Sequence, residues 1–128
     1  MNRCRAIAAV SGIYDASVGV VMLTGRPILA RLFAVSLPTP PIHADLNGIF
    51  LLSVAAGYLI PYREPQSPGG RAYLWIMGPG LKGAGAAAFL LDYAIRHSPR
   101  SFLLFAISDG ALALLTLAAL LTSTSPDA

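Results

Sequence analysis

Long apolar stretches separated by short polar segments dominate the pattern of this sequence. Four of them run from about residue 6 to 24, 46 to 62, 72 to 95 and 101 to 122, each bounded by charged or turn residues. Each is close to the roughly 20 residues that cross a hydrocarbon core about 30 Å thick as an α-helix. Inside lipid, only helices and closed barrels satisfy every backbone polar group. The pattern predicts an all-α, single-domain integral membrane four-helix bundle over residues 1–128.

The connection between the first two stretches is longer than a tight turn and divides into two parts. Residues 27–36 carry apolar positions at mostly helical spacing and begin with proline, which predicts a short helix lying in the membrane interface. Residues 37–42 contain three prolines and are expected to be extended. We expect Asp45 to cap the second helix and the segment around Pro61 to close it. Two interpretations are open for this connection. It is a loop that merely packs on the bundle, or it is a lid or partner-docking segment over one end of the bundle.

Composition narrows the class further. Hydrophobic residues make up 55% of the chain and charged residues 12%, against roughly 25% charged residues in a soluble domain, which excludes an ordinary soluble globule and a disordered chain. The nine basic residues are dispersed, so no nucleic-acid track is expected. A lone Cys4 and the absence of ligand spacings predict no disulfide, no metal and no cofactor. A basic segment before the first stretch resembles a signal peptide, but Asp15 within that stretch favours a retained helix.

The arginines do not decide the orientation. Two sets of four flank the stretches on opposite sides, so the positive-inside rule gives no preference: Arg3, Arg5, Arg63 and Arg71 on one side, Arg26, Arg31, Arg96 and Arg100 on the other. We take both termini as cytoplasmic, and the balance also permits dual insertion. The preference for arginine over lysine, with abundant Ala, Gly and Pro, suits a bacterial cytoplasmic membrane protein. Asp92 precedes Arg96 by four residues and is expected to pair with it at the interface.

Three charged residues remain inside the apolar stretches. From a rise of about 1.5 Å per residue, we expect Asp15, Lys82 and Asp109 to converge near the middle of the membrane. One interpretation is a buried ion pair that only fixes helix register, and the other is a site that binds a proton or a ligand. Two short segments of the chain are similar to each other: residues 13–19 and 107–113 both contain Ile-x-Asp followed by small residues, with Asp15 in the first and Asp109 in the second.

The third stretch carries two further patterns. Gly78, Pro79 and Gly80 predict a kink or a helix break one turn before Lys82, because proline removes a backbone donor. Small residues repeat at helical spacing beyond it and predict a face for close helix packing, including self-association or contact with other membrane proteins: Gly80, Gly83, Ala84, Ala87 and Ala88.

The four-helix layout with a helix in a long first loop resembles the DoxX-like group of small bacterial membrane proteins, a resemblance that assigns no site residue. An acidic residue in the first helix, here Asp15, is also similar to small multidrug-resistance transporters, although the long first loop and Lys82 depart from that pattern. The leading hypothesis is a non-enzymatic component of a membrane assembly. The alternative is a small proton-coupled transporter or ligand-binding protein using the three charges, and an enzyme acting on a lipid or quinone ranks third.

Overall fold

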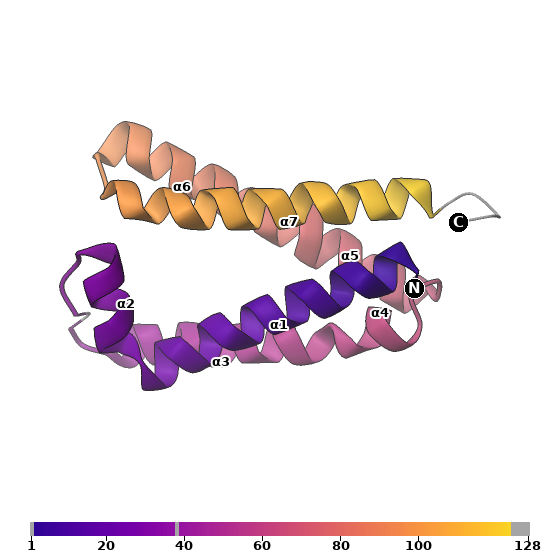
Figure 1. Ribbon diagram of the computed structural model, residues 1–128, viewed down its shortest axis with the longest axis horizontal. Helices are drawn as coiled ribbons and strands as arrows, with labels where there is room; N and C mark the ends of the chain where they lie inside the picture. The colour runs from indigo at the N-terminus through magenta and orange to yellow at the C-terminus, as the bar shows by residue number, and fades with distance from the viewer. Residues whose placement is uncertain (1, 38, 124–128) are drawn as a thin grey trace.

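The computed structural model describes residues 2–37 and 39–123, and helices account for nearly all of that part of the chain (Figure 1). The expectation of an all-α fold is therefore confirmed for the described residues. In chain order, the helices are α1 (Arg3–Thr24), α2 (Arg26–Phe33), α3 (Ile42–Gly57), α4 (Leu59–Arg63), α5 (Pro68–Trp75), the π-helix η1 (Ile76–Lys82), α6 (Gly83–Arg96), the 3₁₀-helix η2 (Arg100–Phe102) and α7 (Leu103–Thr122).

Four continuous or nearly continuous helical segments are long and apolar enough to cross a membrane. They span Arg3–Thr24, Ile42–Arg63, Pro68–Arg96 and Arg100–Thr122, with 22, 22, 29 and 23 residues. The first and third begin earlier than the apolar pattern predicts, because side chains cap them. The Asn2 side chain accepts from the amide of Cys4 at 2.8 Å, and the Ser67 hydroxyl accepts from the amide of Gly70 at 3.0 Å.

The second segment corrects one expectation, the position of its N-cap. Helix α3 starts at Ile42, so Asp45 is not the N-cap but lies in the first turn, where the helix dipole favours a carboxylate and where it pairs with Arg26. Pro61 lies inside the last helix of the segment, α4, which ends at Arg63, within the stretch expected to close it. It lacks the N–H that would bond the Gly57 carbonyl, so the helix is interrupted at Tyr58 and resumes as α4.

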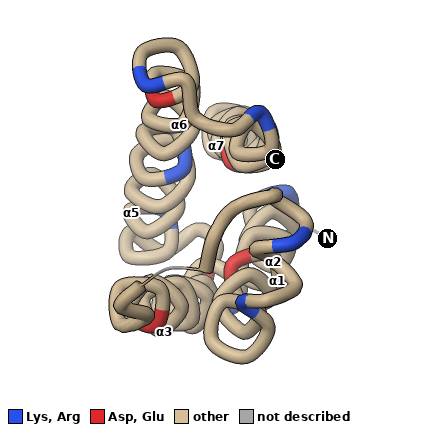
Figure 2. Tube along the Cα trace, turned by 90° about the vertical axis from the view of Figure 1, so that its left-hand side faces the viewer, with Lys and Arg blue, Asp and Glu red and all other residues tan. Residues whose placement is uncertain are grey.

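The helices form two layers that diverge along their length. Helices α1 and α3 pack on each other in one layer, and α6 packs on α7 in the other. The layers meet at the end that holds the start of α1 and the end of α7, where α5 also contacts α4 and α7, and they separate toward the end that holds α2 (Figure 1). Seen along the bundle, α1 lies beside α3 and α6 beside α7, at the corners of a rectangle (Figure 2).

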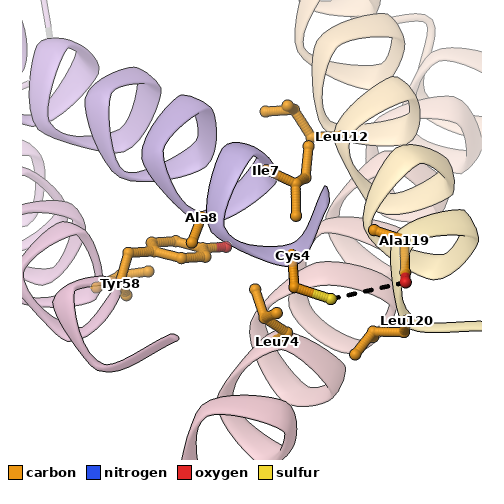
Figure 3. Packing of buried hydrophobic residues seen from close by; sticks show 9 residues of the cluster. Cys4, Ile7, Ala8, Tyr58, Leu74, Leu112, Ala119 and Leu120 are labelled. Atoms are coloured by element: carbon orange, nitrogen blue, oxygen red, sulfur yellow. Dashed lines mark hydrogen bonds between the residues drawn. The ribbon is translucent and has the colours of Figure 1, made fainter. Parts of the chain in front are cut away.

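The dry core lies where the layers meet. Cys4 and Ile7 of α1, Tyr58 at the end of α3, Leu74 of α5 and Leu120 of α7 belong to one cluster of buried side chains (Figure 3). The Cys4 Sγ lies 3.6 Å from the Ala119 carbonyl oxygen. Two arginines close this end by donating to free helix-terminal carbonyls: Arg5 to Tyr62 at 2.8 Å and Arg71 to Leu120 at 3.2 Å. The bundle is thus solid at the terminal end.

The helix does not break at Gly78–Gly80 but continues as the π-helix η1. Pro79 cannot donate to the carbonyl four residues earlier, and the wider π-helical turn, with bonds to the fifth residue, accommodates the missing donor. Gly78 is buried against α7: a Cβ at this position would lie 2.5 Å from the Thr116 Cγ2. Only glycine fits this contact, because Thr116 is itself fully buried.

The Gly78 contact generates the first prediction. Gly78→Ala should lower the free energy of unfolding in detergent by about 1–3 kcal/mol, because the added methyl overpacks the contact with Thr116. Thermal unfolding followed by circular dichroism measures it. Gly69→Ala is the matched control, since a Cβ there meets no atom within 4 Å. Equal stability of the two variants would contradict the packing.

Candidate functional site

The interior charges meet as an ion pair. The Lys82 Nζ lies 2.7 and 2.8 Å from the two carboxylate oxygens of Asp15. Asp15 is 1% exposed and Lys82 is 4% exposed, so neither charge has access to bulk solvent. The ammonium also lies 5.3 Å from the centre of the Tyr14 ring and 6.0 Å from that of Tyr58. The two charges thereby compensate each other, and the two aromatic faces further stabilise the ammonium.

Two helices position this pair. Asp15 belongs to the face of α1 that also buries Ser11 and Gly19, at spacings of four residues. Lys82 is the last residue of the π-helix, and it is buried like Gly78 one turn earlier. π-Helical turns occur often at functional sites because they redirect side chains. Here the π-helix ends at the residue that pairs with α1.

Asp109 is the third member of the predicted cluster and occupies a different position. It is half-buried and forms no ion pair within 4.0 Å among the described residues. Its carboxylate lies within electrostatic range of Lys82 and Asp15 and within hydrogen-bonding reach of the Tyr14 hydroxyl, and a Cβ on Gly85 would lie 3.5 Å from its Oδ2. The three charges therefore converge, but only Asp15 and Lys82 are paired.

The residues that precede the two aspartates also meet. The hydroxyl oxygens of Tyr14 and Ser108 lie 2.6 Å apart, which makes a hydrogen bond between α1 and α7. The two similar segments, residues 13–19 and 107–113, thus lie against each other at this hydrogen bond. Adjacency along a helix gave no reason to expect it, since neighbouring helical residues point in different directions.

The cluster borders a cavity of about 290 Å³ between the two layers. Its polar lining comes from Asp15, Lys82, Asp109 and Tyr14, together with Asn47 of α3. Its remaining lining is apolar and includes three phenylalanines, one each from α3, α6 and α7: Phe50, Phe89 and Phe105. A mostly apolar cavity with a few convergent polar groups is the usual form of a small-molecule site.

Helix α2 covers the end where the layers separate. A second cavity of about 410 Å³ lies beneath it and adjoins the first, since Met22, Asn47 and Phe105 line both. Phe33 of α2 stacks on Phe105 with ring centres 4.9 Å apart, and Phe105 stacks on Phe89 at 5.3 Å. Helix α2 of the long first loop therefore packs across the end of the bundle where the layers separate.

Most of the predicted small-residue face does not pack against another helix of the chain. Gly80, Ala84, Ala87 and Ala88 are exposed, and only Gly83 of that set is close to α7. The contact with α7 uses Ala86 instead, which is buried and faces Gly110. The predicted face is therefore exposed on the chain, and its packing against another protein or a second copy stays a prediction.

Two buried hydroxyls lie close to the ion pair. Ser11 is fully buried and Tyr58 is 2% exposed, and the two hydroxyls lie near each other without full hydrogen-bond geometry. Ser11 lies one helical turn from Asp15, and the Tyr58 ring faces Lys82. An interval of four residues between Ser11 and Asp15 is the one sequence signal that could have associated Ser11 with the site.

Asp92 pairs with Arg96 at 3.3 Å, as expected, and Asp92 also accepts from the Ser98 hydroxyl. Residues 2–37 and 39–123 contain no group of three or more His, Cys, Asp or Glu that could hold a metal ion. No protein-family model, curated protein or solved structure matches the chain.

The buried pair generates the second prediction. Lys82→Met should lower the free energy of unfolding by about 3–5 kcal/mol, because it leaves two carboxylates without a counter-charge. Adding Asp15→Asn to Lys82→Met should restore part of that loss, which a double-mutant cycle in detergent measures. The matched control is the surface pair, where Asp92→Asn with Arg96→Met should change stability by no more than about 0.5 kcal/mol. Additive effects of the two interior substitutions would show that the pair is not coupled.

Proposed function

We propose that the chain is an integral membrane protein that crosses a bacterial cytoplasmic membrane four times and binds a small ligand in the cavity beside Asp15 and Lys82. The membrane assignment is supported by four helices long and apolar enough to cross, and by the many large apolar side chains that these helices expose. The four-helix layout with α2 in the first loop also supports the proposed likeness to the DoxX-like group.

The observation that carries ligand binding is the cavity itself. A purely structural ion pair would be packed on every side, as the terminal core is. The Asp15 and Lys82 pair instead forms one wall of an open volume, with Asp109 on another. The ligand enters from the α2 end, because a second cavity adjoins the first beneath α2 and the core cluster fills the space between the layers at the opposite end. Loading and release then require only displacement of the Phe33 and Phe105 stack.

The exposed small residues of α6 favour a second candidate function. Gly80, Ala84, Ala87 and Ala88 form an outward surface on which a helix of another membrane protein, or of a second copy, can approach closely. This surface supports the role of a component in a membrane assembly. The two proposals are compatible, because the surface and the cavity occupy different faces of α6.

The membrane topology is the third prediction. Ser67 and the N-terminal end of α1 should lie on one side of the membrane, and Ser98 on the other. In a Cys4→Ala background, Ser67→Cys and Ser98→Cys should react with an impermeant maleimide from opposite sides of sealed vesicles. Reaction of each cysteine from both sides would indicate dual insertion. Reaction of both from the same side would contradict the four crossings.

The fourth prediction tests the cavity. Gly85→Leu should fill the space next to Asp109 and weaken binding of tert-butylbenzene, an apolar probe of suitable size, by at least about tenfold. Binding is measured in detergent from the ¹³C-methyl signal of Met22, which lines the cavity, with the Met77 signal as the internal control. The matched variant is Ala84→Leu on the exposed face of α6. No probe-dependent shift of Met22 in the unmodified protein would overturn ligand binding.

A further inference from the structure

The charges that line the cavity do not balance. At neutral pH, two carboxylates and one ammonium give the lining a formal charge of minus one. The ammonium is already committed, since it lies within 2.8 Å of both Asp15 oxygens. The uncompensated group is therefore Asp109, which remains without an ion-pair partner among the described residues. An unpaired carboxylate in apolar surroundings is costly unless a cation or a proton neutralises it.

The surroundings of Asp109 suit an organic cation better than a hydrated metal ion. Besides Asp15, which Lys82 already pairs with, the cavity offers one unpaired carboxylate, the Asn47 amide, the Tyr14 ring and hydroxyl, and the rings of Phe89 and Phe105. Aromatic faces attract ammonium groups, most strongly where water is excluded. Metal ions such as Mg²⁺ or Ca²⁺ need several oxygen ligands, and a single unpaired carboxylate and one amide among aromatic walls do not supply them. The apolar lining can instead cover the body of an organic ion.

Resting on the proposed ligand-binding function, the geometry points to a specific class of ligand: a small monovalent organic cation with an apolar or aromatic body, its charged group beside Asp109. Asp109 supplies the counter-charge, and the Asp15 and Lys82 pair forms a neutral wall that fixes the position of the helices. The Lys82 ammonium repels a cation placed against it, so the charged group of the ligand lies on the side of the cavity formed by α6 and α7, next to Gly85.

The test compares three probes of similar size that differ in charge. Phenyltrimethylammonium and tert-butylbenzene have nearly the same shape, because a quaternary nitrogen replaces a quaternary carbon, and benzenesulfonate is a comparable anion. Each is titrated into ¹³C-methyl-methionine protein in detergent while the Met22 and Met77 signals are recorded. Phenyltrimethylammonium should bind at least about tenfold more tightly than benzenesulfonate. This arm requires no substitution, so it does not depend on the folding of a variant.

The second arm assigns the preference to Asp109. Asp109→Asn keeps the shape and removes the charge, and it should weaken phenyltrimethylammonium binding by about tenfold or more while leaving tert-butylbenzene binding within about twofold. Comparing each probe with itself cancels its partition into detergent. Asp92→Asn is the matched control, because it removes a carboxylate at the far end of α6 and should leave all three titrations unchanged. An unchanged Met77 signal verifies that each variant is folded.

The failures are distinguishable. If tert-butylbenzene and both ions bind equally well, or if Asp109→Asn weakens the cation and the hydrocarbon equally, the cation assignment is overturned while the ligand-binding cavity stands. Tighter binding of benzenesulfonate than of phenyltrimethylammonium would also overturn it. If none of the three probes shifts Met22, the proposed binding function itself fails.

Discussion

The ion pair between Asp15 and Lys82 is the contact on which the rest of the structure depends. Each charge, taken alone into an apolar interior, would cost several kcal/mol, so the two must meet with short, direct hydrogen bonds. This requirement ties α1 of one layer to the π-helix of the other at a single register. Two features hold Lys82 at this register. One is the π-helix that ends at Lys82, and the other is the close contact of buried Gly78, one turn earlier, with Thr116.

On the two sides of this pair the bundle differs in character. Toward the termini, the layers converge on a dry cluster around Cys4, Leu74 and Leu120, and Arg5 and Arg71 bind the last carbonyls. Toward α2, the layers separate, and phenylalanine rings and open volume take the place of close packing. A bundle closed at one end and hollow at the other gives a ligand one route to the charges. The binding proposals follow from this asymmetry, because Asp109 lies on the hollow side.

Much of the fold could be predicted from the apolar stretches and turn residues. A stretch of about 20 apolar residues has few alternatives to a helix, because its backbone N–H and C=O groups must all be hydrogen-bonded. The same reasoning identified Asp15, Lys82 and Asp109, because charged residues are conspicuous inside apolar runs. It did not identify which face of α6 packs on α7. A helix that is apolar or small on every side has no hydrophobic periodicity to distinguish the face toward α7 from the face toward its surroundings. Gly80 and Ala84 were chosen by spacing, whereas Ala86 forms the contact.

The sequence by itself determined the helical class, the number of long apolar helices, the short helix in the first loop and the small set of interior charges. Composition and spacing are local properties, and they suffice for these conclusions. Only the tertiary structure decided which carboxylate pairs with Lys82, that Tyr14 meets Ser108, and that the cluster lines a cavity. Those outcomes depend on the rotation and tilt of each helix. Packing between residues distant in the chain sets both, so no single helix encodes them.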